Sequence, residues 1–202
     1  MKKLQLVILP LLFLWFTGCN EPVFIPDPSK PALPVYTEDG HNVAGAVING
    51  QNWTSYVGGS YYNDIRMIYD QDSGRFAISI PGSFNNYNLN YQDDNNLVFV
   101  LYTNEITSIY DLKKLEGSVI SLDNQNGFGI ITSYDEIQYH GITNLKVKSQ
   151  SGKLHINYVK DSYPRIISGT FGFDYTDMND EVYSVYYGRF DFKVYQSDFS
   201  IY

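Results

Sequence analysis

Apolar and polar residues alternate with a period of two along much of the chain after residue 42. In "RFAISI", Phe76, Ile78 and Ile80 fall on one face, which is typical of a strand with one buried side. "NLVFVLYT" is apolar almost throughout, which indicates a strand covered on both faces. The other alternating runs place on one face Leu154, Ile156 and Tyr158 ("KLHINYV"), Ile167, Gly169, Phe171, Phe173 and Tyr175 ("IISGTFGFDY"), and Phe190, Phe192 and Val194 ("GRFDFKVY", with Arg189, Asp191, Lys193 and Tyr195 opposite).

Turn signals separate these strands. Asn49-Gly50 predicts a tight hairpin between "VAGAVI" and "QNWTSYV". "DQDSG" (70–74), "DNQNG" (123–127) and "TDMND" (176–180) indicate further turns, and "ITSIYDLKKLEG" (106–117) is the one helix candidate. The pattern therefore predicts an all-β domain: an antiparallel β-sandwich or partly closed barrel of about ten strands, with at most one or two short helical turns.

The amino-terminal segment has a different pattern. Lys2 and Lys3 precede an uncharged, apolar run over residues 4–16, which is shorter than the roughly 20 residues of a transmembrane helix. Phe16-Thr17-Gly18-Cys19 resembles the lipobox of bacterial lipoproteins, although Phe16 stands where Leu is usual. That resemblance implies a signal peptide over residues 1–18 and a membrane anchor through acylated Cys19, the only cysteine in the chain. The alternatives are an ordinary signal peptide with a chance cysteine, or a short buried helix.

Residues 19–41 contain five of the eight prolines, at positions 22, 26, 28, 31 and 34. Because proline fixes its backbone angle and lacks an N–H donor, this segment is expected to be an extended, lipidated tether. The alternative is a loop wrapped on the domain surface. Residues 42–202 remain for a single all-β domain, a length that supports a sizeable core.

The net charge of the chain limits the classes of partner that it can bind. The chain has 14 Lys and Arg against 22 Asp and Glu, a net charge of −8. Removal of Lys2 and Lys3 with the signal peptide would make the balance 12 − 22 = −10. Such a protein repels phosphate backbones and anionic leaflets, so nucleic acid is excluded as a partner and the lipid must hold the protein on the membrane. Asn20 is not the Asp that resembles an inner-membrane retention signal, which favours the outer membrane and leaves the periplasmic or outer face open.

Three stretches carry a second resemblance: "INGQNW", "SGKLHINYVKDSYPRIISGTFGFDY" and "VYYGRFDFKVY". Together they resemble a domain of unknown function found in small lipoproteins of Bacteroidota-type bacteria. The resemblance covers about residues 43–195 and is weakest in the middle of the chain. It implies an all-β lipoprotein of the cell envelope and no known chemistry.

A search for catalytic and metal-binding residues identifies none. His41, His140 and His155 lack the spacing of metal ligands. No Gly-x-Ser-x-Gly motif occurs, and the neighbouring acids Asp93-Asp94, Asp135-Glu136 and Asp180-Glu181 fit solvated turns better than facing carboxylates. "DQDSG" resembles half of a calcium loop but is explained by a hairpin turn; weak calcium binding at an Asp- and Asn-rich loop stays open. No cofactor is expected.

Two functions of different class remain. The first is a non-catalytic binding or structural module of the envelope, with a glycan, peptide or envelope protein as ligand. The second is an envelope hydrolase acting on glycan or peptide, with unidentified catalytic carboxylates. The chain is rich in tyrosine, with 19 residues. Trp53 is expected to face the core, and the tyrosines after it, Tyr56, Tyr61 and Tyr62, are the candidate ligand-binding residues because exposed tyrosines can form a stacking platform.

Overall fold

The computed structural model describes residues 23–55, 65–84, 95–133, 145 and 147–202. Within these ranges the regular secondary structure is mostly β-strand. The strands are β1 (Pro26–Asp27), β2 (Lys30–Pro34), β3 (Val43–Ile48), β4 (Gln51–Ser55), β5 (Arg66–Asp70), β6 (Arg75–Ser83), β7 (Asn95–Leu101), β8 (Val119–Ser121), β9 (Gly127–Ser133), β10 (Ser149–Lys160), β11 (Arg165–Thr176), β12 (Val182–Val194) and β13 (Phe199–Ile201). Two short 3₁₀ helices, η2 (Ile109–Leu115) and η3 (Gln196–Asp198), complete the described elements.

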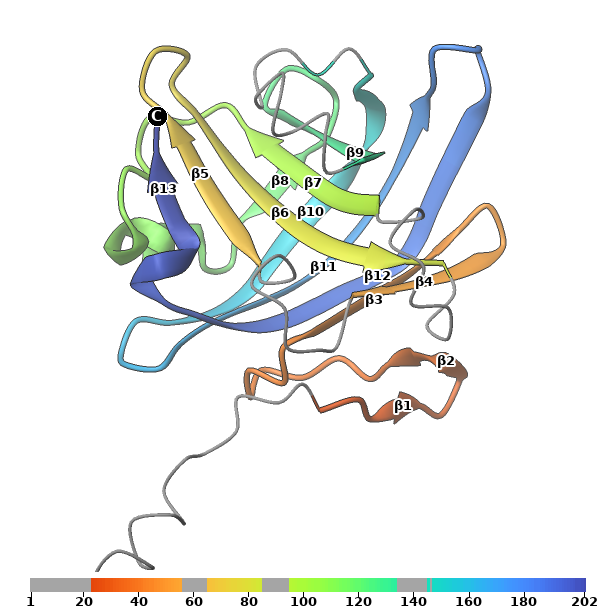
Figure 1. The fold of residues 1–202 in the computed structure, drawn as a ribbon, viewed down its shortest axis with the longest axis horizontal. Coiled ribbons are helices and arrows are strands. Elements are labelled where there is room, and N and C mark those ends of the chain that lie inside the picture. The colour runs from red at the N-terminus through yellow and green to blue at the C-terminus, as the bar shows by residue number, and fades with distance from the viewer. Residues whose placement is uncertain (1–22, 56–64, 85–94, 134–144, 146) are drawn as a thin grey trace, which may run out of the picture.

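Eleven strands form one sheet that curls into a half-barrel (Figure 1). The order is β13-β5-β6-β4-β3-β12-β11-β10-β8, and β7 pairs with both β6 and β9. The pairs are antiparallel except β13 with β5, which run parallel. The predicted fold class, an all-β sandwich or partly closed barrel with little helix, is confirmed.

Ser149 joins two strands that share no backbone ladder. Its hydroxyl oxygen accepts the N–H of Gly129 in β9 at 2.8 Å, and the hydroxyl donates to the carbonyl oxygen of Leu122 at 2.8 Å. The side chain is fully buried. A single serine at the start of β10 therefore holds β9 beside β10, and the barrel closes partly at this point.

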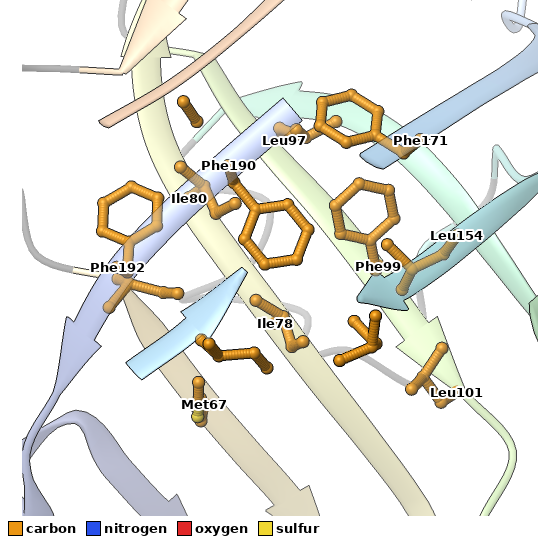
Figure 2. Packing of buried hydrophobic residues seen from close by; sticks show 14 of the residues in the cluster. Met67, Ile78, Ile80, Leu97, Phe99, Leu101, Leu154, Phe171, Phe190 and Phe192 are labelled. Carbon is orange, nitrogen blue, oxygen red and sulfur yellow. The ribbon is translucent and has the colours of Figure 1, made fainter. Parts of the chain in front are cut away.

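The inner faces of the strands build one large core. Figure 2 shows Phe99, Phe171 and Phe190 converging with Ile78 and Leu154 inside the curl of the sheet. The Phe99 and Phe171 rings meet edge to face, with centroids 5.0 Å apart. The predicted inward faces of β6 and β11 are confirmed, because the apolar residues of both alternating runs lie in this core.

Strand β7 is buried on both faces, as its unbroken apolar run predicts. Leu97, Phe99 and Leu101 belong to the large core. Val98 and Val100 point to the other side, where they pack in a second cluster with Ala77, Phe128, Ile130 and Leu145. The sequence from 96 to 101 lacks alternation because neither of its faces meets water.

The predicted buried face of β10 is wrong in the second half of the strand. Tyr158 was expected to share the buried face of Leu154 and Ile156, but the register of β10 against β11 shifts between Ile156 and Tyr158. Because β10 has one extra residue at this irregularity, the side chains that follow it point to the opposite face of the sheet. Val159, 2% exposed, joins the core in place of Tyr158.

Trp53 lies in the core, as predicted, and is completely buried. Its strand begins directly after the predicted Asn49-Gly50 turn, in which both residues have positive φ, 48° and 82°. This is the signature of a tight hairpin whose twist matches the flanking strands. Within the described chain, Nε1 of Trp53 has no hydrogen-bond partner.

Residues 23–41 do not form the expected extended spacer. They follow the alternative and lie against the half-barrel, with β1 and β2 forming a small two-stranded sheet below it (Figure 1). Leu33 is fully buried, and Pro34 packs closely against Gly45 of β3. Proline is tolerated here because edge and turn positions need few backbone donors. Cys19 and the expected signal peptide lie outside the described residues.

Asp191 holds the end of this segment on the barrel. Its carboxylate accepts hydrogen bonds from the N–H groups of Gly40 and His41 at 2.9 and 3.0 Å, and from the hydroxyls of Thr37 and Ser168 at 2.5 and 2.7 Å. The side chain is only 2% exposed. Its position opposite Phe190 and Phe192 was predicted to be the polar face, and residues 37–41 now cover that face.

Candidate ligand-binding pocket

A pocket of about 370 Å³ opens at one end of the half-barrel, where β6, β9 and β11 end and β7 and β12 begin. This volume lies in the range of small-molecule sites, roughly 300–1,000 Å³. Most of the wall is apolar or aromatic: Phe84, Ile130, Ile131, Leu145, Val147, Tyr175, Met178 and Tyr183. Asn95, Thr132 and Asp177 supply the polar groups.

Two tyrosines form the aromatic side of the pocket. Tyr175 in β11 and Tyr183 in β12 are directly opposed in the antiparallel ladder. Their rings stack with centroids 5.0 Å apart and an angle of 11° between the planes. Cross-strand aromatic pairs of this kind stabilise a sheet and give a rigid surface. The pocket is therefore framed by side chains that the ladder itself positions.

Both phenols stay protonated over the physiological range. Burial, followed by the neighbouring Tyr183 and Asp177, holds the pKa of Tyr175 well above its usual value. Burial also raises the pKa of Tyr183, and the nearby Glu181 adds to the effect. Tyr183 donates its hydroxyl to Glu181 at 3.3 Å. These groups can donate hydrogen bonds, but they are unsuited to act as bases near pH 7.

Asp177 supplies the carboxylate in the pocket wall. Backbone N–H groups of the turn between β11 and β12 already donate hydrogen bonds to this carboxylate. It accepts the N–H groups of Asn179 and Glu181 at 2.8 and 2.9 Å. These hydrogen bonds, that from Glu181 first, lower its pKa. A general acid of a glycosidase needs a raised pKa and a facing partner. Asp177 instead keeps a negative charge beside the pocket and orders the turn.

In two other turns, an Asp side chain likewise accepts backbone N–H groups of its own turn. Asp70 accepts the N–H groups of Asp72 and Ser73 in the "DQDSG" turn, and Asp123 accepts those of Gln125 and Asn126 in "DNQNG". The hairpin explanation of "DQDSG" is thereby confirmed. Across the residues that the structure describes, no three His, Cys, Asp or Glu side chains group in a way that could hold a metal ion.

The sequence-predicted candidates are not brought into this pocket. Cys19, Tyr56, Tyr61, Tyr62 and His140 lie outside the described residues, as do the acid pairs at 93–94 and 135–136. His41 lies beside Thr37 near Asp191, with 3.2 Å between Oγ1 and Nδ1, and His155 lies in β10 opposite Thr170.

Sequence reasoning missed the pocket-forming pair. Tyr175 was placed on the inward face of its strand, and "TDMND" was recognised as a turn. The signal that could have found the site is a tyrosine on each side of that turn, which a tight hairpin would bring opposite each other.

A second hollow, of about 410 Å³, lies near η2 and β8 and is lined by Leu101, Tyr102, Thr103, Leu115, Ser118, Val119, Ile120, Ser121 and Asn126. It has one aromatic ring, and that ring already lies under the guanidinium of Arg75 at 5.0 Å. Its polar groups serve the neighbouring turn, where Tyr102 donates to Asn124 at 2.7 Å. The pocket beside Tyr175 is the better candidate for a ligand.

These features define an all-β protein with a half-barrel sheet and an aromatic-walled pocket at one end. No family model, curated protein or solved structure matches the chain. In the described ranges, no helix has the length and apolar character needed to cross a membrane.

Proposed function

We propose that this protein is a lipid-anchored module of the cell envelope that binds its ligand, without catalysis, in the pocket beside Tyr175 and Tyr183. The observation that carries the binding part is the pocket itself: an apolar, aromatic wall built on paired strands, with few polar groups. Ligand sites in proteins have this composition. The lipobox-like segment ending at Cys19 supports the anchor.

The charge of the pocket limits its ligand. Asp177 is ionised at neutral pH, because hydrogen bonds lower its pKa, and the chain as a whole carries −8. Both charges repel anions. The pocket therefore suits a neutral or cationic ligand with an apolar face, such as a sugar ring or the hydrophobic side chain of a peptide.

The hydrolase is the weaker candidate on this geometry. Two carboxylates facing each other across a cleft would support it, at a separation of roughly 5–10 Å. The pocket wall contains one carboxylate, that of Asp177, and the backbone of its own turn already occupies it. Binding without catalysis needs no pair of carboxylates, and the apolar and aromatic pocket wall is sufficient for it.

The pocket is tested with two matched variants, one in the turn between β11 and β12 and one at the start of β12. Met178 lines the pocket and Val182 does not, although both are exposed, 72% and 63%. Met178→Asp should weaken binding of the neutral apolar dye Nile red, and of any ligand found on glycan and peptide arrays, by tenfold or more. Val182→Asp should leave both unchanged. Melting curves of both variants check that the fold is intact.

Two outcomes would count against the proposal. If the wild type binds nothing on either array and Nile red responds equally to both variants, the pocket is not a binding site. If the wild type cleaves a glycan or peptide that it binds, the hydrolase replaces the binding module.

The anchor has its own test. Cys19→Ser should give a protein that takes up no radioactive fatty acid and stays unprocessed or is released from the membrane. Equal fatty-acid labelling of this variant and the wild type would end the lipoprotein interpretation, whatever the pocket binds.

A further inference from the structure

Three consecutive apolar side chains at the start of the described chain are exposed. Val23, Phe24 and Ile25 have exposed fractions of 46%, 38% and 44%. Elsewhere among the described residues, large exposed apolar side chains occur singly or as pairs along the sequence, and single ones are ordinary on protein surfaces. A contiguous apolar stretch held on a surface marks an interaction site instead.

The backbone of this stretch is fixed to residues 35 and 41, and Asp191 of β12 in turn holds the N–H of His41 at 3.0 Å. The N–H of Val23 donates to the carbonyl oxygen of His41 at 2.8 Å, and the carbonyl oxygen of Ile25 accepts the N–H of Val35 at 2.7 Å. These bonds fall at its first and last residues. The three side chains therefore remain at the surface although the segment that bears them is docked.

The stretch begins very near the expected lipid. Three residues, Asn20 to Pro22, separate Val23 from Cys19. Four residue steps of a fully extended chain cover at most about 14 Å. An acyl chain on Cys19 would be embedded in the bilayer, so the docked Val23 could not lie farther than this from the membrane surface.

We propose that Val23, Phe24 and Ile25 contact the lipid bilayer, so that the half-barrel rests on the membrane on its β1–β2 side. This inference rests on the acylation of Cys19 in the proposed function. A long spacer would leave the domain free to turn, but residues 23–41 are packed on the barrel and supply no such spacer. The surface is apolar, and the net charge of −8 makes attraction by charge an inadequate alternative.

The other end of the same hairpin carries residues suited to a membrane–water boundary. Lys30, at the start of β2, places its ammonium 4.6 Å from the ring of Tyr187. Tyr186 and Tyr187 are both exposed, and their rings meet edge to face with centroids 5.2 Å apart. Tyrosine is enriched where protein meets lipid headgroups. This end of the hairpin would meet the headgroups while residues 23–25 reach deeper.

The test measures depth in a bilayer. Acylated Cys19 has no free thiol, so an introduced cysteine is the only one that reacts with a maleimide. Phe24→Cys and Ser73→Cys are labelled with a polarity-sensitive fluorophore and placed in vesicles of phosphatidylethanolamine and phosphatidylglycerol that contain brominated lipids. Ser73 is exposed in the turn between β5 and β6, on the opposite side of the molecule from β1 and β2 (Figure 1). We expect the label at position 24 to be quenched several-fold more than the label at 73.

The outcomes separate this inference from the anchor. Equal quenching at both positions in fatty-acid-labelled protein overturns the docked orientation and leaves the anchor intact. Protein whose Cys19 still reacts with maleimide lacks the acyl group, which overturns the anchor and this inference together. Binding in the pocket is measured separately and is unaffected by either result.

A triple variant tests the same surface without a probe at it. Changing Val23, Phe24 and Ile25 together to Ser should keep the protein anchored but speed the rotation of a label on Ser73→Cys, measured as fluorescence anisotropy on vesicles. Val182→Ser is the control and should leave the rotation unchanged, because Val182 is also an exposed apolar residue but lies at the start of β12 and not in β1 or β2. An unchanged anisotropy in the triple variant would contradict the inference.

Discussion

The indole of Trp53 occupies the space that any side chain on Gly82 would need. A Cβ on Gly82 would overlap Cζ2 of the indole and lie 2.5 Å from the carbonyl oxygen of Thr54. The two strands meet at this point, where Ser55 pairs with Gly82. The largest buried side chain thus fits against the neighbouring strand only because that strand has no side chain there.

Gly82→Ala should therefore destabilise the fold by about 1–3 kcal/mol, the usual cost of overpacking a filled core. Urea denaturation measures the loss. Gly172→Ala is the matched control, since a Cβ there would lie 3.2 Å from its nearest neighbour, the carbonyl oxygen of Val185. Equal losses in the two variants would show that the Trp53 contact does not limit residue 82.

Asp191→Ala should cost about 3 kcal/mol or more, because it leaves the N–H groups of Gly40 and His41 without their buried acceptor. Asp191→Asn keeps one acceptor oxygen and should cost less. The free energy of unfolding from urea denaturation is the measurement. Asp174→Ala on the neighbouring strand is the control: Asp174 is exposed and, among the described residues, its carboxylate accepts the hydroxyl of Ser151 at 3.2 Å, so the loss should be within about 0.5 kcal/mol.

A chain that starts at residue 42 should be less stable than one that starts at residue 23. The shorter chain loses the fully buried Leu33 and uncovers Asp191. Thermal melting followed by circular dichroism compares the two, and the shorter chain should melt lower or aggregate. Identical melting temperatures would show that residues 23–41 do not stabilise the domain and act only as a tether.

Stability should depend on Asp111 in a defined pH window. Lys114, and after it Ser108, lower the pKa of Asp111 from its ordinary 3.8 to about 2. A lowered carboxyl pKa stabilises the fold above the unfolded value of 3.8 and loses that effect as the pH falls through about 2. Asp111→Asn should cost about 0.5–1 kcal/mol at neutral pH, as for other partly exposed ion pairs, and this cost should shrink as the pH falls from 3.8 through about 2 and vanish below that.

Melting temperatures at several pH values test this window. Lys114→Gln removes the partner of the 2.7 Å ion pair, so the effect of Asp111→Asn should shrink in that background. A cost of Asp111→Asn that is independent of pH would mean that the side chain acts through packing and not through its charge.

Local pattern was sufficient wherever a property depends on neighbouring residues. Alternation predicted the buried faces of β6, β11 and β12, because successive side chains of a strand point to opposite sides whatever the rest of the fold does. Asn49-Gly50 predicted its hairpin for the same reason: both residues accept positive φ, as observed. The sequence by itself thus determined the all-β class, most of the core and the turns.

Contacts between distant positions were decided by the tertiary structure alone. A carboxylate at 191 meets backbone N–H groups at 40 and 41, and nothing near either segment encodes that meeting. The register irregularity after Ile156, which exchanges Tyr158 for Val159 in the core, likewise comes from pairing with β11. The proline-rich segment lies on the barrel because Leu33 finds a buried place there. The pocket arises where five strand ends converge around the Tyr175–Tyr183 pair, and only the closure of the sheet brings those ends together.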